Sequence, residues 1–229
     1  MCSSDLTGPR VYVPGDSGAV ALGADDVAAE VARLGAPLGV TVVRTGSRGL
    51  YWLEPLVEVE TPQGRIGYGP VRVADVEGVF GAGLAKGAAH PLRVGRPEEL
   101  PYLQGQDRVT FARVGVVDPR SLGDYLATGG FAGLRRALAM APDAIVQEIT
   151  DAGLRGRGGA AFPTGIKWRT VLEQASPVKY ITCNADEGDS GTFSDRMVME
   201  GDPFMLLEGM AIAGLAVGAT EGYIYLRVE

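Results

Sequence analysis

Gly153–Trp168 reads GLRGRGGAAFPTGIKW, and Cys183–Gly191 follows it with CNADEGDSG. The first stretch holds five glycines and three basic residues within sixteen positions. Glycine lets backbone N–H groups approach a phosphate, and neighbouring cations add positive charge. The second stretch gathers side chains that suit ribose hydroxyls and amide edges: Asn184, Asp186, Glu187 and Asp189. Together the two stretches predict a pocket for a phosphorylated, hydroxyl-rich cofactor, as in a nucleotide or flavin enzyme.

The glycine-rich stretch is not a standard dinucleotide or nucleotide loop. Gly156–Ala161 matches G-x-G-x-x-A, but such a loop must leave a strand and open a helix, with an acidic residue about 20 positions later. Here a predicted helix precedes the loop, Pro163 interrupts the segment after it, and Asp186 lies beyond that distance. Lys167 is followed by Trp168, so the Walker arrangement is absent too. Glycines alone are more typical of a plain loop, whereas the three cations favour an anion site.

The acidic turn comes directly after a predicted buried strand at 179–183, where α/β folds place ligand contacts. A solvated loop is the alternative interpretation. Cys183 is interpreted as a buried hydrophobic residue rather than a nucleophile, and His90, the single histidine, as a structural or solvated residue. Metal-ligand spacing is absent. We therefore predict no metal site and no catalytic side chain, and expect a redox cofactor to supply the chemistry.

The composition limits the class of protein. The chain has 229 residues, of which 46% are hydrophobic and 21% charged, as in ordinary globular proteins. Its 34 glycines are about twice the average usage. A net charge of −7 argues against nucleic acid or an anionic membrane as a partner. Two cysteines give no disulfide framework and indicate a reducing compartment, so we expect a cytoplasmic protein. From the pattern of apolar residues we also expect neither a membrane span nor a signal peptide.

Hydrophobic periodicity divides the chain into two α/β parts. Residues 1–9 are predicted to be a tail, of which 1–6 look like a sequence artefact. Residues 10–92 are predicted to form a thioredoxin-like domain with the order β-α-β-β-β-α. Its expected strands and helices are 11–13, 19–34, 40–44, 56–60, 65–68 and 73–80. Residues 93–142 are expected to be a linker with short helices at 122–126 and 133–140.

Residues 143–229 are predicted to form the cofactor domain. Its expected helices and strands are 143–150, 165–174, 179–183, 194–200, 203–217 and 223–227. The last of these reads as a strand that starts a new unit shortly before the sequence stops. We therefore expect this chain to be a fragment of a longer protein, and the cofactor domain to be incomplete.

Five segments carry a family resemblance: GLRGRGGAAFPTGIKW, YITCNADE, GTFSDR, LLEGM and GYIYLR. They resemble the NADH-binding flavoprotein subunit of respiratory complex I. The same module occurs in NAD-reducing hydrogenases and in NAD-dependent, molybdenum-containing formate dehydrogenases. The resemblance runs from about Val109 to Glu229. It implies FMN over the glycine-rich loop, NADH stacked on the flavin, hydride transfer between the two, and exit of electrons through iron–sulfur clusters.

The resemblance assigns ten residues to the cofactors. Those expected to hold FMN through the glycine-rich loop, with the lysine near the phosphate, are Gly156, Arg157, Gly158, Gly159 and Lys167. Those expected at the ribityl chain and the isoalloxazine edge are Asn184, Asp186 and Glu187. Phe162 would stack against the adenine of NADH. Asp189 stands where complex I subunits usually carry Glu near the nicotinamide, and its shorter side chain alters its reach.

The N-terminal part is similar to the thioredoxin-like [2Fe-2S] ferredoxins, which carry C-x4-C after the first strand and C-x3-C after the second. Alignment puts these four ligand positions at Pro14, Ala19, Ser47 and Tyr51, none of which can bind iron through a thiolate. This part is therefore expected to be a docking or packing module that lacks a cluster. A flavoprotein subunit with such a domain in front most resembles the beta subunit of soluble NAD-dependent formate dehydrogenase.

The resemblance also implies partners. We expect a thioredoxin-like [2Fe-2S] gamma-type subunit and a molybdopterin and iron–sulfur alpha-type subunit, with a [4Fe-4S] cluster only beyond Glu229. The expected function is that of a diaphorase coupled to formate oxidation, and the fragment alone is expected to be inactive. Three alternatives stay open: a flavoprotein subunit of a NAD-reducing hydrogenase, one of a complex I-like NADH:quinone oxidoreductase, and a non-catalytic assembly scaffold. The preference for NAD over NADP and the physiological direction are also left open.

Overall fold

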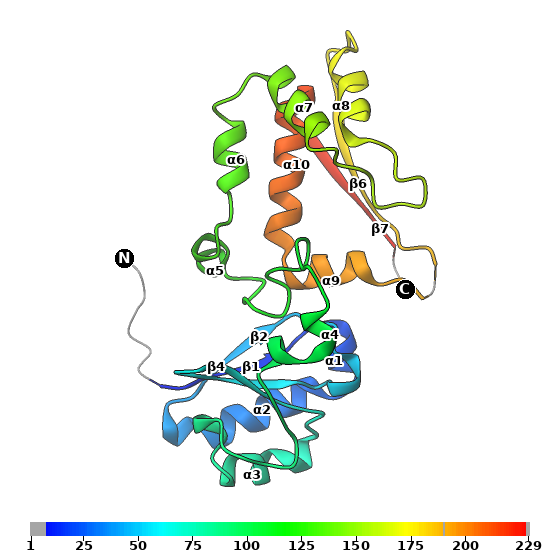
Figure 1. The fold of residues 1–229 in the computed structure, drawn as a ribbon. Helices are drawn as coiled ribbons and strands as arrows, with labels where there is room; N and C mark the ends of the chain where they lie inside the picture. The colour runs from blue at the N-terminus through cyan, green and yellow to red at the C-terminus, as the bar shows by residue number, and fades with distance from the viewer. Residues whose placement is uncertain (1–7, 190, 228–229) are drawn as a thin grey trace. The chain divides into compact units, whose positions relative to one another are not determined.

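The computed structural model describes residues 8–189 and 191–227. They form two compact units (Figure 1). The first unit contains the described residues up to Asp124 together with Met197–Asp202, and the second contains Tyr125–Arg196 and the residues from Pro203 onward. Both units combine strands with helices, which confirms the predicted α/β fold class.

The first unit is built on a five-stranded sheet in the order β2-β1-β3-β4-β5. Strand β1 runs parallel to β2, whereas β3 and β4 follow it as antiparallel neighbours. The strands are β1 (Arg10–Pro14), β2 (Thr41–Thr45), β3 (Val57–Thr61), β4 (Gly64–Tyr68) and β5 (Arg93–Gly95). The helices are α1 (Ser17–Ala21), α2 (Ala24–Gly35), α3 (Val73–Gly81) and α4 (Pro101–Gln104). Up to α3 this is the predicted succession with one difference: the single helix predicted at 19–34 is divided into α1 and α2 at Gly23, whose φ of 94° cannot continue a helix.

Strand β5 lies in the segment that the sequence predicts to be a linker. It pairs with β4 through Tyr68 opposite Arg93 and Gly67 opposite Gly95, with a register shift between the two pairs. A strand of three residues, RVG, is too short for hydrophobic alternation to reveal it. The later part of the same segment contains α5 (Leu122–Ala127) and α6 (Ala132–Ala137), close to the two short helices that were predicted.

The core of the first unit lies between the sheet and helices α2 and α3, which cover the same face of the sheet (Figure 1). Val27 and Val31 lie one turn apart on α2 and are both buried, as helical periodicity requires. They belong to one hydrophobic cluster with Val11 and Val13, which point inward from alternate positions of β1. The opposite face of α2 carries its charged residues, so the amphipathic pattern alone fixes which side of the helix meets the sheet.

Charged groups are also buried in this unit. Arg48 and Glu58 form a bidentate pair, with Nε–Oε1 at 2.5 Å and Nη2–Oε2 at 2.8 Å, and their side chains are 5% and 4% exposed. Ser47, one of the four positions aligned with iron ligands, is buried and donates to Oε1 of Glu54 at 2.6 Å. The second oxygen of Glu54 accepts from the backbone N–H of Leu56 at 2.9 Å. Polar groups buried here are therefore partnered mainly with one another.

Burial raises the pKa of Glu54 to about 7, and the hydrogen bond from Ser47 opposes this shift. The nearby carboxylates of Asp16 and Glu58 raise it further. Because the folded pKa exceeds the unfolded value, the folded unit retains a proton on Glu54 that the unfolded chain releases. This stabilisation is fully present below the unfolded pKa and is lost as pH rises through about 7.

We predict that the free energy of unfolding of the first unit falls by up to about 3 kcal/mol between pH 4.5 and pH 7.5 because of Glu54. Urea unfolding, followed by the fluorescence of Trp52, measures this dependence. The variant Glu54→Gln, which does not titrate, should lose less stability over the same range. Glu99→Gln changes an exposed carboxylate and is the matched control. Equal pH dependence in wild type and Glu54→Gln would contradict the prediction.

The second unit is organised around helix α10 (Pro203–Val217), which packs against α6, α7 (Pro142–Asp151), α8 (Thr164–Leu172) and the sheet (Figure 1). Strands β6 (Tyr180–Ala185) and β7 (Glu221–Leu226) pair in parallel from Tyr180 opposite Glu221 to Ala185 opposite Leu226. Helix α9 (Ser194–Gly201) follows the acidic turn, and its first three residues belong to this unit. The buried core contains Ile145 and Val146 of α7 with Ala216 and Val217 of α10.

Helices α7 and α8 approach each other closely at a glycine. Gly165 is buried, and a Cβ built on it would lie 2.2 Å from Oγ1 and 2.8 Å from Cα of Thr150. Since backbone atoms cannot give way at that distance, no larger residue fits without separating the helices. The glycine at the start of α8 therefore serves packing between helices, and the loop that precedes α8 is held against α7 by this contact.

A single carboxylate on α10 organises the start of α6. Glu208 accepts hydrogen bonds from the N–H of Phe131 at 2.8 Å, the N–H of Leu134 at 2.9 Å and the hydroxyl of Tyr125. The N-cap residue of α6 is Phe131, which has a φ of 58° and makes no side-chain cap. The acidic residue in an otherwise apolar helix therefore replaces the missing cap of its neighbour.

We predict that Glu208→Ala lowers the free energy of unfolding of the second unit by about 1–3 kcal/mol, because it leaves part-buried donors at the start of α6 without their acceptor. Thermal or urea unfolding monitored by circular dichroism checks this. Glu208→Gln keeps an acceptor oxygen and should lose less. Glu148→Ala removes a surface ion pair with Arg136 and is the control, with an expected change of under about 1 kcal/mol. A Glu208→Ala variant as stable as this control would refute the capping role.

Membrane insertion by a helix finds no support: among residues 8–189 and 191–227, no helix combines the length and the apolar character that a span requires.

Candidate functional site

The glycine-rich loop is a self-closed hairpin between α7 and α8. Arg155 and Pro163 form an antiparallel bridge, Gly156 N–H donates to the carbonyl of Phe162 at 2.9 Å, and Thr164 N–H donates to Leu154 at 2.8 Å. The Arg155 guanidinium donates to the carbonyl of Ala161 at 3.1 Å. These bonds fix the base of the loop. Arg155 is thus used to hold the loop together, a role that the sequence did not reveal.

The tip of the loop presents unused backbone donors. Within the part of the chain that the structure describes, the N–H groups of residues 157–160 donate no hydrogen bond. The space above the tip is open as well, because a Cβ built on Gly158 or Gly159 meets nothing within 4 Å. Consecutive free N–H groups with adjacent cations form the kind of concavity that binds anions. The loop tip therefore offers backbone donors of the kind that an anion site needs, and the anion site itself stays a prediction.

Phe162 and Lys167 lie together where the loop ends and α8 begins. The Nζ atom of Lys167 is 5.7 Å from the centre of the Phe162 ring, a cation–π contact across the first turn of α8. Phe162 is 45% exposed, so one face of an aromatic ring is available at the loop. The residues predicted for a phosphate and for an adenine ring are therefore neighbours.

The acidic turn directly follows β6. Oδ1 of Asn184 accepts from the N–H of Asp186 at 3.2 Å, which closes a local turn. Glu187 has a φ of 44° and directs its carboxylate at the start of α9. The carbonyl of Gly188 accepts from the Arg227 guanidinium at 2.8 Å. Arg227, at the end of β7, is a residue of this region that sequence reasoning did not single out.

The structure arranges the ten predicted residues in two groups, both at the surface. One group is the glycine-rich loop with Phe162 and Lys167, and the other is the acidic turn with Asp189. No hydrogen bond or ion pair between the described site residues joins the two groups. Within the second group Glu187 differs from its neighbours, since its carboxylate already has hydrogen-bond partners.

Cys183 lies on β6 just before the acidic turn and is half-buried. Burial raises the pKa of its thiol, and the charge of Asp195 raises it further. Burial and the carboxylate of Glu187 in turn raise the pKa of Asp195. A thiol held in its protonated form is a poor nucleophile. The interpretation of Cys183 as a non-catalytic residue is therefore consistent with its surroundings.

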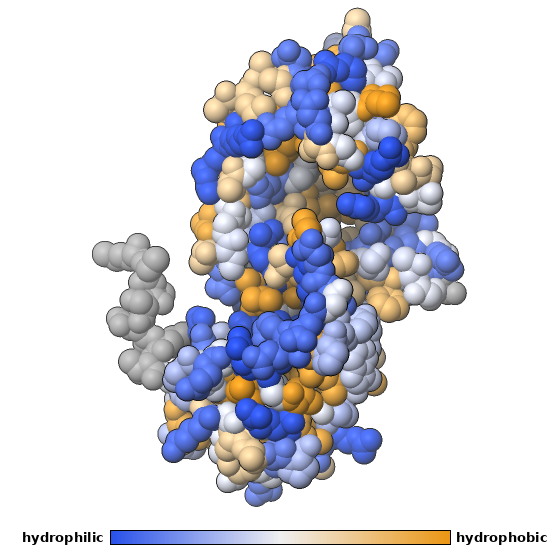
Figure 2. Space-filling view, viewed as in Figure 1, coloured by the Kyte–Doolittle hydropathy of each residue, from blue (hydrophilic) through white to orange (hydrophobic). Residues whose placement is uncertain are grey.

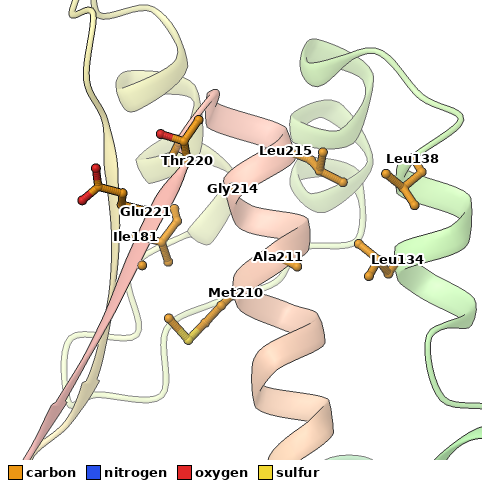
Figure 3. Close-up of a pocket in the computed structure, with 11 residues that line it drawn as sticks. Leu134, Leu138, Ile181, Met210, Ala211, Gly214, Leu215, Thr220 and Glu221 are labelled. Carbon is orange, nitrogen blue, oxygen red and sulfur yellow. The ribbon is translucent and has the colours of Figure 1, made fainter.

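The second unit also contains an apolar pocket of about 380 Å³ (Figure 3). It lies between α6, α10 and the first residues of β7, and its walls include Leu134, Leu138, Ile181, Met210 and Leu215. Figure 2 shows this unit hollowed on the viewed face, with pale orange residues inside the hollow. None of the residues that line the pocket is among the ten predicted site residues. The pocket and the predicted cofactor groups are therefore separate features.

Comparisons with known proteins place a family resemblance on the same residues. Residues 149–229 match the family model of the Nuo51 FMN-binding domain. Over 124 residues the chain is 50% identical to the NADP-reducing hydrogenase subunit HndC of Solidesulfovibrio fructosivorans, covering 54% of this chain and 25% of that protein. It is 49% identical over 122 residues to an NADH-quinone oxidoreductase subunit of Rhizobium meliloti, covering 53% of this chain and 29% of that protein.

A crystal structure of a NAD+-reducing [NiFe]-hydrogenase in the air-oxidized state aligns with 95% of this chain and 37% of its own, at a TM-score of 0.41 and 26% identity. The aligned part of the chain spans between 25% and 29% of the length of the two curated relatives. The family model and these two relatives support the predicted resemblance to NADH-binding FMN flavoprotein subunits. The relationship to formate dehydrogenases in particular stays a prediction.

We predict that Cys183 reacts slowly with alkylating reagents. In a Cys2→Ser background, which leaves Cys183 as the single thiol, alkylation by iodoacetamide at pH 7.5 should be at least about 10-fold slower than that of glutathione. Mass spectrometry over time measures the rate. Urea should restore rapid modification, which controls for reagent quality. A native rate faster than that of glutathione would instead indicate an activated thiolate.

Proposed function

We propose that this chain carries the FMN-holding part of an NAD(H)-dependent flavoprotein subunit. The observation that carries the proposal is the row of free N–H groups at residues 157–160, in a loop that leads directly into the helix of Lys167 and within the segment that matches an FMN-binding domain. A phosphate monoester needs several donors and compensating positive charge, and this loop offers both.

The residues present fit the chemistry of FMN. The open space above Gly158 and Gly159 lets a phosphate reach the backbone, and a Cβ at either position would project into that space. Arg157 and Lys167 supply the cations. In the acidic turn, Asn184 and Asp186 offer an amide and a carboxylate, which suit the ribityl hydroxyls and the polar edge of an isoalloxazine ring, and the resemblance implies that Asp189 lies near the nicotinamide. The two groups of residues thus correspond to the two ends of the cofactor.

When bound, FMN supplies hydride acceptance from NADH and delivery of single electrons. The chain's own residues bind and orient. Phe162 offers a ring face on which an adenine stacks, and the loop N–H groups fix the phosphate. No side chain is needed as a general acid or base. The contribution of the protein is therefore placement of one flat ring system over another.

The finer proposal is a diaphorase that works with iron–sulfur subunits in formate oxidation in the cytoplasm. Its support is the sequence resemblance of the two-domain arrangement to formate dehydrogenase beta subunits, with Ser47 and Tyr51 in place of cluster cysteines. The names of the relatives favour two alternatives as well, a hydrogenase subunit and a subunit of an NADH-quinone oxidoreductase. A [4Fe-4S] cluster would belong to residues after Glu229. HndC is described as NADP-reducing, so NADH and NADPH both need to be tested.

We predict that Lys167→Ala weakens FMN binding by about 10- to 100-fold, since one charged hydrogen bond to phosphate is worth about 1.5–3 kcal/mol. Gly158→Val should weaken binding as well, because its side chain would fill the open space above the loop. Titration of FMN, followed by quenching of its fluorescence, measures the dissociation constant for this chain and for the product of the open reading frame that contains it. Matched controls are Lys86→Ala and Gly81→Val in the first unit, where a Cβ on Gly81 also meets nothing within 4 Å.

Two outcomes would contradict this function. Undiminished FMN content in both loop variants would show that the loop does not hold the cofactor. If the protein binds FMN but the flavin stays oxidised when NADH or NADPH is added in the absence of oxygen, the result would favour the alternative of a non-catalytic assembly scaffold. If the flavin is reduced, the partner subunits remain to be identified. Copurified molybdopterin would support a formate dehydrogenase, and copurified nickel would support a hydrogenase. If neither copurifies, the NADH:quinone oxidoreductase alternative is favoured.

A further inference from the structure

We propose that Glu187 is a positioning residue of the cofactor site rather than a ligand of the flavin. Its carboxylate caps α9 from the preceding loop and thereby holds the acidic turn in the conformation that presents Asn184, Asp186 and Asp189. This inference rests on the proposed function, because it assigns the role of one residue within the same site.

The first argument is the geometry of the cap. Oε1 of Glu187 accepts from the N–H of Asp195 at 2.7 Å, and Oε2 accepts from the N–H of Arg196 at 3.0 Å. Since α9 starts at Ser194, these are the second and third N–H groups of the helix, which an N-cap side chain normally satisfies. The residue at the N-cap position is Phe193, whose side chain contains no acceptor. Glu187 therefore performs the capping from seven positions before the helix begins.

The second argument is that this leaves Glu187 little capacity for another ligand. Both of its oxygens are engaged, and its negative charge lies at the positive end of the helix dipole. By contrast, the carboxylates of Asp186 and Asp189 accept no hydrogen bond from the described residues. In the acidic turn, the carboxylate of Glu187 is therefore bound to backbone N–H groups of α9, whereas the carboxylates of Asp186 and Asp189 are available to a ligand.

The third argument is the backbone of the turn. Glu187 has a φ of 44°, a left-handed conformation that is unfavourable for a residue with a side chain. Such a conformation persists only where the surroundings impose it. Two anchors do so: the bonds of Glu187 to α9, and the 2.8 Å bond from Arg227 to the carbonyl of Gly188. The turn is therefore preorganised from both sides, which lowers the entropy lost when a ligand binds.

The experiment compares Glu187→Ala and Glu187→Gln with Glu173→Ala, a control that removes an exposed carboxylate at the end of α8. Three quantities are measured. Amide hydrogen exchange at Asp195 and Arg196 in flavin-free protein reports the cap. The dissociation constant of FMN reports the site, and the absorbance spectrum of the flavin at saturation reports direct contact with the ring.

We expect Glu187→Ala to speed exchange at both amides by at least about 10-fold and to weaken FMN binding by about 10-fold, with an unchanged flavin spectrum at saturation. Glu187→Gln, which keeps an acceptor oxygen, should restore most of both properties. A changed spectrum, or no rescue by Gln, would identify Glu187 as a flavin ligand and overturn the proposal. Unchanged amide exchange in Glu187→Ala would overturn it too, as would faster exchange with unaltered FMN affinity.

Failure of the proposed function gives a different result. If wild-type protein does not bind FMN, the function is wrong and the cofactor part of this inference falls with it. Amide exchange in the same flavin-free samples still decides whether Glu187 caps α9, so the two failures are distinguishable.

Discussion

Two helices of the second unit, α6 and α9, share one constraint. The residue that precedes each helix has a side chain that cannot accept hydrogen bonds from the first helical turn. Phe131 precedes α6 and Phe193 precedes α9, and neither side chain can accept the orphan N–H groups of a first helical turn. A glutamate from elsewhere supplies the acceptor in each case, Glu208 from α10 and Glu187 from the acidic turn. The N–H groups bound by Glu208 are part-buried and those bound by Glu187 are exposed, so we expect the first carboxylate to contribute more to stability and the second mainly to fix the local conformation.

This use of carboxylates links stability to the candidate site. A loop with many glycines loses much conformational entropy on folding, and its own side chains contribute few contacts. The glycine-rich loop is closed by Arg155 and by the contact of Gly165 with α7, and the acidic turn is closed by Glu187 and Arg227. In both, long charged side chains bond to backbone groups. The groups left unbonded at each loop are then free to meet a ligand.

Features that depend on hydrophobic periodicity could be predicted from the sequence. Features that depend on contacts between residues far apart in the sequence could not. The strands and helices of the first unit follow mainly from the β-branched run of β1, the alternation of β3 and the apolar face of α2, and all three are local signals. Strand β5 has three residues and no alternation, so it was missed. The glycine and acidic segments were recognised by composition. The role of Glu187 was not, because the usual capping signature joins residues three positions apart, whereas this carboxylate reaches across a loop.

In the first unit too, side chains satisfy one another's hydrogen bonds. This occurs at a position where the sequence resemblance implies that an iron ligand is missing. The sequence alignment sets Ser47 where ferredoxin-like proteins carry an iron ligand, and the structure buries that serine with its hydroxyl on Glu54. A buried carboxylate with a pKa of about 7 is tolerated because two donors, from Ser47 and the N–H of Leu56, satisfy its oxygens. The bidentate pair of Arg48 and Glu58 lies in the same unit and belongs to a larger cluster, because Arg48 also pairs with Glu98 at 3.0 Å and Glu58 also pairs with Arg65 at 3.8 Å. Within such a network, we expect the substitution of any single member to destabilise the fold. The position that the alignment compares with an iron ligand is therefore occupied by hydrogen-bonded side chains, next to the apolar core between the sheet and its helices.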